Sequence, residues 1–206
     1  LVEERAVHNH NTYLIPLAVN DELFSKSYSE NTLIPKELIN LKRPIIGHVG
    51  VLNNRIDIEL MLKTSETLDN FSFIFVGPII EVSNEYKLKL NRLKNKNNVF
   101  FLGNKPEEEL PSYLKAIDIC IIPYVKDEVT KYIKANSKFF QYVSAGKPVV
   151  STIGPYNLDD SICMTADTVD DFVLAIKKSL LKNQKDDFEK RKNYIKNHTW
   201  VARVDE

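Results

Sequence analysis

Three lysines near the start of one expected helix are the strongest sign of a ligand site. Lys131, Lys134 and Lys138 precede or open the helix expected over residues 137–145. A helix N-terminus carries about half a positive charge, so each nearby cation costs about 0.3–1 kcal/mol. A bound phosphate would resolve this conflict by meeting Lys138 and the free N–H groups of the first turn together. On the charge pattern alone, a phosphate site and three solvated lysines are equally good interpretations.

Gln141 follows Lys138 by one helical turn and therefore lies on the same helix face. If a phosphate occupies the helix start, the amide of Gln141 could reach a hydroxyl group of the same ligand. An amide donates and accepts, which suits a sugar hydroxyl.

A second candidate segment follows the strand expected at residues 45–49. Gly50 allows a close backbone approach, and Arg55 could add a bidentate phosphate contact. The spacing of Gly47 and Gly50 lacks the three glycines of the dinucleotide fingerprint, which argues against NAD or FAD. Taken alone, this segment favours a simple strand end followed by a solvated arginine.

Backbone groups after two further strands could line a flat pocket for a base. Gly77 follows the apolar run 71–76, and Gly103 and Asn104 follow the run 98–102. Both segments are equally compatible with ordinary turns.

The sequence does not indicate metal binding or a nucleophile. It has no Asp-x-Asp, and His8 and His10 lack a third ligand nearby. His48 sits in an apolar run and is expected to be a hydrogen-bonded core residue. Neither Cys120 nor Cys163 has electropositive neighbours in the sequence, so neither is expected to be reactive. We therefore expect no metal cofactor.

Strands and helices alternate from residue 45 onward and would bring these loops together. Several apolar runs are β-branched or aromatic without polar alternation, as in strands buried on both faces of a parallel sheet. The alternation predicts an α/β fold, a Rossmann-like doubly wound parallel sheet of about six strands with helices on both faces. Ligands of such sheets bind outside the carboxyl ends of the strands. The expected strands lie near residues 45–49, 71–76, 98–102, 117–122, 148–152 and 161–164, and the expected helices cover 56–67, 84–94, 107–116, 137–145, 168–182 and 185–197.

The two ends of the chain fall outside this core. Residues 1–24 are expected to hold one short strand, from Thr12 to Leu17, and residues 198–206 start a new helix. The chain opens at Leu1 rather than at a methionine. We therefore expect a fragment of a longer protein, with both ends leading to a missing neighbour.

The amino-acid composition excludes several classes of protein function. The 206 residues include 28 basic and 28 acidic side chains, which gives a formal net charge of zero. This balance excludes a strongly basic nucleic-acid binder, and a hydrophobic content of 43% excludes a disordered tail. No run of about 18 apolar residues could span a membrane. Two cysteines in apolar runs fit reduced thiols and a cytoplasmic location.

Residues 128–152 resemble the nucleotide-sugar-binding segment of GT-B glycosyltransferases, in particular the group 1 bacterial enzymes that build capsules, lipopolysaccharide and related glycans. Two further segments resemble the interdomain run and a strand–helix stretch of that family. The residues that carry the resemblance are EVTKYI at 128–133, SKFFQYVSAGKPVVST at 137–152, YLIPLAVNDELF at 13–24, NVFFLG at 98–103 and ELPSYL at 109–114.

The resemblance implies that this chain is one half of a GT-B enzyme. Residues 25–197 would be the donor-binding domain, residues 1–24 an interdomain segment from a missing N-terminal domain, and residues 198–206 the start of a crossover helix. The donor would be a UDP- or GDP-linked sugar, and the acceptor a glycan or a lipid-linked group. The missing domain would hold the acceptor and the catalytic residues, so the isolated chain is not expected to transfer sugar.

The resemblance also implies roles for individual residues. Gly50, Arg55, Ser137 and Lys138 match the region that binds the donor diphosphate. Gln141 matches a glutamate that binds the ribose, and as an amide it lacks the charge-assisted strength of a carboxylate. The wider E-x7-E signature is also broken, because Ile133 stands at its first position. Further matches are Gly77, Gly103 and Asn104 in base-binding loops and Glu128, Thr130 and Lys131 on the side of the donor sugar or acceptor.

Two alternatives stay open. A nucleotide-sugar 2-epimerase of the same fold would need catalytic carboxylates and a histidine in the cleft, where the loops offer mostly Lys, Thr and Asn. A degenerate α/β domain used only for association also remains an alternative, because Gln141 departs from the family pattern. For the full-length enzyme, the expected location is the cytoplasm, with peripheral association at the inner face of the membrane, and no nucleic acid is expected as a partner.

Overall fold

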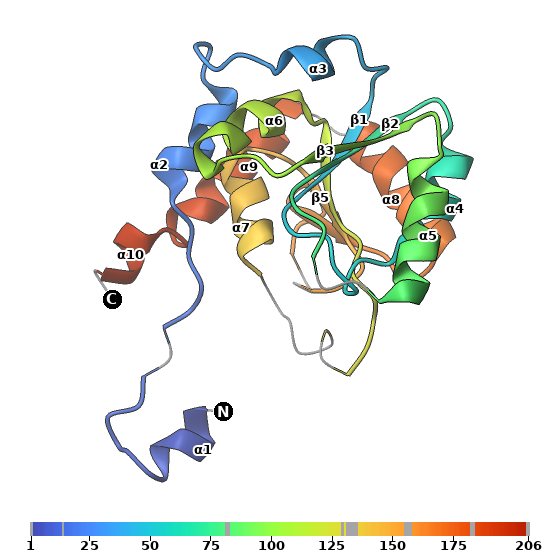
Figure 1. Ribbon diagram of the computed structural model, residues 1–206. Coiled ribbons are helices and arrows are strands. Elements are labelled where there is room, and N and C mark those ends of the chain that lie inside the picture. Colours follow the sequence, from blue (N-terminus) through green and yellow to red (C-terminus); the bar gives the residue numbers. More distant parts are fainter. Residues whose placement is uncertain are drawn as a thin grey trace.

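The computed structural model describes residues 2–13, 15–80, 83–128, 130, 136–154, 158–181 and 184–204, without the side chains of residues 2, 3 and 184. Its centre is a parallel sheet with the strand order β3-β2-β1-β4-β5-β6 (Figure 1). This confirms the predicted doubly wound α/β fold. The strands are β1 (Ile45–Val49), β2 (Ser72–Val76), β3 (Val99–Gly103), β4 (Ile119–Ile122), β5 (Val149–Ser151) and β6 (Cys163–Thr165).

The strands at the middle of the sheet form because their side chains can be buried on both faces. Every residue of β1, β2, β4 and β5 is buried. Strand β1 pairs with β2 on one side and with β4 on the other. The strand order therefore reverses direction between β1 and β4, and the carboxyl ends of these two strands are where ligands of such sheets bind.

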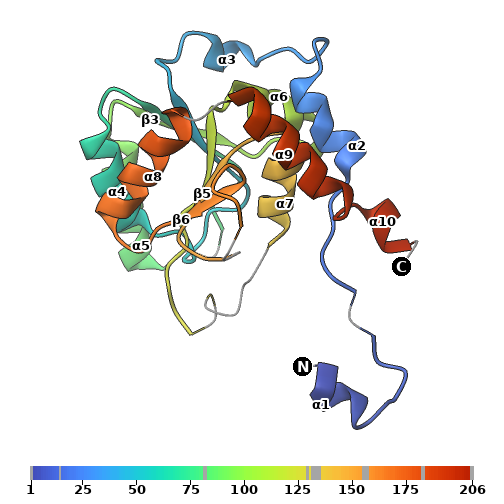
Figure 2. The ribbon, with the colours of Figure 1, turned by 180° about the vertical axis from the view of Figure 1, so that it is seen from behind.

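Helices cover both faces of the sheet. α4, α5 and α8 pack together on one face, and α6, α7 and α9 lie on the other face beside α2, as Figures 1 and 2 show. All six predicted helices form, and no helix end is shifted by more than three residues. Their bounds are α4 (Ile58–Thr67), α5 (Asn84–Lys94), α6 (Leu110–Ala116), α7 (Ser137–Ser144), α8 (Val169–Leu181) and α9 (Gln184–Lys196), and a 3-10 turn, η2 (Glu107–Glu109), precedes α6.

Local residues fix the helix ends. The side chains of Asp57, Ser83 and Asn136 cap α4, α5 and α7 by accepting the N–H three residues further on. Gly146 ends α7 with a left-handed φ of 71°. Its N–H and that of Lys147 turn back to carbonyl groups of the last helical turn, at 2.9 Å each.

The segment before the sheet differs from the prediction. The expected strand from Thr12 to Leu17 is wrong, because the described residues of that stretch belong to no strand. Tyr13, Ile15 and Leu17 are exposed, so their apolar alternation meets no neighbouring strand in the described chain. The elements of this segment are instead α1 (Val2–Ala6), α2 (Asp21–Phe24), the 3-10 helix η1 (Ser25–Tyr28) and α3 (Lys36–Ile39).

The last helix meets the first segment. α10 (Trp200–Val204) forms where residues 198–206 were predicted to start a helix. Val19 pairs with Thr199 in an isolated parallel bridge, and its N–H donates to the His198 carbonyl at 3.0 Å. The domain boundaries after residues 24 and 197 stay predictions. Among the described residues, no helix has the length and apolar character needed to cross a membrane.

Candidate functional site

The loops that follow β1 and β4 are joined by backbone hydrogen bonds at the carboxyl ends of these strands. The N–H of Asp57 donates to the Pro123 carbonyl, and the N–H of Val125 donates to the Arg55 carbonyl, both at 2.7 Å. These bonds hold the residues after β1 in a fixed position beside the residues after β4. The two loops are therefore joined rather than independent.

Three glycines end three neighbouring strands and lie in a row along this edge. The N–H of Gly50 donates to the Val76 carbonyl at 2.7 Å, and the N–H of Gly77 donates to the Gly103 carbonyl at 2.8 Å. A Cβ atom on Gly77 would lie 2.1 Å from the carbonyl oxygen of Gly50, so only glycine allows this approach. Gly77 is buried and its N–H is already used, whereas Gly103 and Asn104 are exposed. A base contact by these three residues stays a prediction.

The side chain of Lys138 extends directly over Gly50. A Cβ atom on Gly50 would lie 2.1 Å from Cε and 2.6 Å from Nζ of Lys138. Asn136 caps the helix so that Lys138 falls in its first turn, where the side chain can reach across the end of β1. The structure thus brings together two residues that lie 88 positions apart in the sequence and that were both predicted to bind phosphate.

The charge around Lys138 is unbalanced. Burial is the main cause that lowers the pKa of its ammonium group, and the positive charge of Arg55 lowers the pKa further. Among the residues that the structure describes, no carboxylate lies within ion-pair distance of Lys138 or Arg55. Two cations at one strand end without a counter-ion attract an anion.

One buried side chain, that of Tyr142, supports this arrangement and was not predicted as part of it. The hydroxyl of Tyr142 donates to the Val49 carbonyl at 2.9 Å and accepts the Val49 N–H at 2.8 Å. It therefore holds α7 against the last residue of β1. No sequence pattern marks this contact, because a tyrosine among apolar helix residues is typical of any core.

His48 is buried close enough to Lys138 to be affected by its charge, and it is neutral. Its Nδ1 lies 3.1 Å from the Ile121 carbonyl, and Nε2 is also buried. Burial, and next the charge of Lys138, lower the pKa of His48 to about 3. The predicted hydrogen-bonded core histidine is confirmed at Nδ1. Its neutral state avoids a third positive charge at this edge.

Two residues of α7 offer free polar groups toward a ligand. Gln141 is half-buried, and its side-chain amide makes no hydrogen bond to any described residue. Ser137 is exposed at the helix start. Their predicted contacts with ribose and diphosphate stay predictions, and within the described part of the chain neither side chain makes a hydrogen bond.

In the loop after β4, one of the residues assigned to the side of the donor sugar or acceptor is already used to form the loop. Thr130 is buried, and its hydroxyl donates to the Val125 carbonyl at 2.6 Å and accepts the Asp127 N–H at 2.8 Å. In this structure Thr130 shapes the loop. Glu128 is exposed, whereas Lys131 and Lys134 lie outside the described residues. A ligand contact for any of these residues stays a prediction.

Metal ligands do not gather at this edge. Within the described part of the chain, no group of three or more His, Cys, Asp or Glu side chains could hold a metal ion. The polar groups present are an ammonium, a guanidinium, an amide and backbone N–H groups, which are donors suited to phosphate oxygens.

Known structures share this fold over nearly the whole chain. Sucrose-phosphate synthase from Thermosynechococcus elongatus aligns with a TM-score of 0.65 at 18% identity, covering 98% of this chain and 53% of that one. The C-terminal domain of the group 1 glycosyl transferase LpcC from Francisella tularensis aligns with a TM-score of 0.51 at 12% identity, covering 91% of this chain and 97% of that one. At such identities the likeness shows the fold alone.

Sequence comparison gives the family. The chain is 26% identical over 162 residues to TuaH of Bacillus subtilis (strain 168), a protein named for a glycosyltransferase role in teichuronic acid biosynthesis. The match covers 76% of this chain and 40% of TuaH, so the chain spans less than half of that relative. The family model described as glycosyl transferases group 1 matches residues 29–199. Because that match covers most of the sequence, the chain belongs to the group 1 glycosyltransferase family.

Proposed function

We propose that this chain is the donor-binding domain of a glycosyltransferase that moves a sugar from a UDP- or GDP-linked donor to a glycan or lipid-linked acceptor. The observation that carries the proposal is the position of Lys138 across Gly50, at the point where the strand order reverses. Arg55 adds a second positive charge, and no described carboxylate balances the two. A diphosphate supplies the missing negative charge.

Each part of the donor has a candidate partner in this arrangement. The diphosphate would lie against Gly50, Lys138 and Arg55, where ammonium and guanidinium N–H groups can donate to its oxygens. The ribose would lie beside the free amide of Gln141, one helical turn further on. The base would lie toward Gly103 and Asn104, at the exposed end of β3.

The same cations would assist sugar transfer. When the bond between the anomeric carbon and the donor oxygen breaks, the nucleoside diphosphate leaves with an additional negative charge. Lys138, held across Gly50, would stabilise that charge, and the exposed Arg55 could approach it from the neighbouring loop. The acceptor hydroxyl and the groups that remove its proton would come from the remainder of the full-length protein.

The acceptor class suggests where the full-length enzyme works. A lipid-linked acceptor would lie at a membrane surface, so we propose peripheral association at the inner face of the cytoplasmic membrane. Fractionation of cells that produce the full-length protein tests this proposal. Recovery in the membrane fraction with release by high salt is expected, and recovery only in the cytosolic fraction contradicts it.

Nucleotide titration tests the donor-binding proposal directly. We expect UDP or GDP to bind, with backbone amide shifts at residues 50–55 and 137–141 in NMR spectra. Uridine and guanosine are matched controls that lack the diphosphate, and we expect them to bind at least about tenfold more weakly, since one charge-assisted hydrogen bond contributes about 1.5–3 kcal/mol. Binding of neither diphosphate, or equal binding of the nucleosides, contradicts the proposal.

A further inference from the structure

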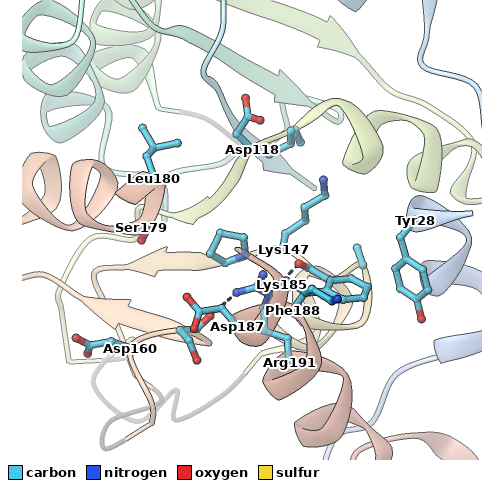
Figure 3. Close-up of a pocket in the computed structure, with 15 residues that line it drawn as sticks. Tyr28, Asp118, Lys147, Asp160, Ser179, Leu180, Lys185, Asp187, Phe188 and Arg191 are labelled. Atoms are coloured by element: carbon cyan, nitrogen blue, oxygen red, sulfur yellow. Dashed lines mark hydrogen bonds between the residues drawn. The ribbon is translucent and has the colours of Figure 1, made fainter. Parts of the chain in front are cut away.

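A cavity lies at the amino ends of the strands (Figure 3). It has a volume of about 430 Å³ and lies where β4, β5 and β6 begin, beside Asp118, Pro148 and Ser161. The end of α8 and the start of α9 complete its wall. The candidate donor site lies at the carboxyl ends of the strands, so the two sites lie at opposite ends of the same strands. A volume of this size is within the range of small-molecule pockets.

One polar group in the wall has unused hydrogen-bond donors. The ammonium of Lys147 carries three N–H donors, and the Lys115 carbonyl at 3.2 Å is its one hydrogen-bond acceptor in the described part of the chain. The hydroxyl of Ser161 is buried beside Asp159, and its hydrogen bond is the main cause that lowers the pKa of the Asp159 carboxylate. The unused donors of Lys147 therefore point to a ligand that brings acceptors.

Arg191 makes this part of the wall rigid. It is buried, and its guanidinium donates to the Gly146 carbonyl at 2.8 Å from Nε and to the Ser161 carbonyl at 2.6 Å from Nη1. Gly146 in turn packs against Phe188, whose ring carbon would lie 2.4 Å from a Cβ atom at that position. The loop after α7, the segment before β6 and α9 are therefore locked together around the cavity.

Three carboxylates also line the cavity, those of Asp118, Asp160 and Asp187, and each interacts with other groups of the protein. Asp118 pairs with Arg43, and its other carboxylate oxygen accepts the Ile45 N–H at 2.7 Å. The carboxylate of Asp187 lies near the buried Arg191 guanidinium. Lys185, exposed at the start of α9, adds an ammonium group to the cavity rim. The cation of Lys147 is thus the group that a ligand would satisfy.

The rest of the wall is apolar. The rings of Tyr28 and Phe188 meet edge to face with their centroids 5.1 Å apart, and Leu180 and Pro148 also line the cavity. Figure 3 shows Phe188, Lys147, Lys185 and Tyr28 among the residues that line the cavity. An aromatic surface next to two ammonium groups suits a flat apolar body that carries an anionic group.

We propose that this cavity is a second ligand site for an organic anion, in which one phosphate or carboxylate group is joined to an apolar ring. The anion would accept hydrogen bonds from Lys147, and Lys185 would approach it from the rim. The ring would lie against Phe188 and Tyr28. Burial lowers the pKa of Lys147 in the free protein, and a bound anion would favour its charged form.

Titration with small aromatic anions tests this proposal. Phenyl phosphate and benzoate are the probes, phenol lacks the anion, and inorganic phosphate lacks the ring. We expect at least one of the two aromatic anions to shift the backbone amides of residues 117–118, 146–148 and 185–191. Phenol and inorganic phosphate should bind at least about tenfold more weakly, because each lacks one of the two contacts.

Variants assign the binding to this cavity. Lys147→Met should weaken binding of the aromatic anion by roughly ten- to a hundredfold, as expected for the loss of one charge-assisted hydrogen bond. Lys138→Met should leave it unchanged, because Lys138 lies at the other end of the strands. If Lys147→Met does not fold, Ser179→Phe fills the cavity without removing a charge and should abolish the shifts. Shifts confined to residues 50–55 and 137–141, no shifts with either anion, or unchanged binding to a folded cavity variant overturns the proposal.

Discussion

Replacement of Lys138 by methionine should separate ligand binding from stability. The change removes the ammonium group over Gly50 and keeps a side chain of similar length. Loss of a charge-assisted hydrogen bond to a diphosphate should weaken UDP or GDP binding by about 1.5–3 kcal/mol, which is roughly ten- to a hundredfold in the dissociation constant. Calorimetric titration of both nucleotides measures this loss.

The same substitution should leave the ligand-free domain equally stable or more stable. Lys138 opposes the positive end of α7, which costs about 0.3–1 kcal/mol, and no described carboxylate compensates for its burial. Because folding lowers the pKa of Lys138, the unfolded chain holds this proton more tightly. The destabilisation is therefore full at neutral pH and fades as the pH rises toward the ordinary value of 10.5.

Thermal and urea unfolding at pH 7 and pH 10 measure the predicted stability of the ligand-free domain. Lys177→Met is the matched control, since it makes the same chemical change on the exposed side of α8. It should alter neither nucleotide binding nor the dependence of stability on pH. If Lys138→Met binds nucleotide like the parent, or if it clearly destabilises the ligand-free domain, Lys138 is a structural residue and the site assignment is wrong.

Three further predictions concern single side chains. Gln141→Ala should weaken UDP or GDP binding by about 0.5–1.5 kcal/mol, less than Lys138→Met, because a neutral hydrogen bond is lost; an equal or larger loss in titration would contradict this order. His48 should make the domain sensitive to acid, because its folded-state pKa of about 3 lies below the ordinary 6.5. The free energy of unfolding should therefore fall by about 1.4 kcal/mol per pH unit below about pH 6. His48→Gln should flatten this slope in urea titrations at pH 7 and pH 5. Trp200 is 51% exposed and should be readily quenched by acrylamide in the isolated chain, whereas strong protection would show that residues 198–206 pack on this domain.

The sheet and its helices could be predicted because burial on both faces leaves a clear pattern. Runs such as residues 71–76 have no polar alternation, and strong stop signals such as Gly146 bound the helices between them. These local features agree with the fold, so strand positions and helix ends followed within a few residues.

The first 44 residues were harder to predict because their elements are short and depend on distant contacts. α2 and α3 have four residues each, too few to show a helical period. Phe24 and Leu38 are buried against the sheet domain, which stabilises these turns through packing rather than propensity. The alternating apolar residues near Tyr13 predicted a strand, but a strand needs a partner to satisfy its backbone groups.

The residues proposed to contact the donor could be predicted from the sequence, whereas the side chain that holds them in place could not. Lys138 stood out because a cation at a helix start conflicts with the helix dipole, and Gly50 because it follows a buried strand. The hydroxyl of Tyr142, which joins α7 to the end of β1, gave no such sign. Its two hydrogen bonds connect residues 93 positions apart, and only the fold brings them together.

Lys138 and Lys147 show why one candidate site could be predicted from the sequence and the other could not. Both are ammonium groups that burial deprives of solvent, and they lie at opposite ends of one short helix. Lys147 follows the C-terminus of α7, where a cation agrees with the helix dipole, so nothing in its local sequence suggests a site. Only the cavity beside it and the aromatic wall of Phe188 reveal one. A charge that conflicts with its helix can be found from sequence, whereas a charge that agrees with its helix needs the surrounding space to be known.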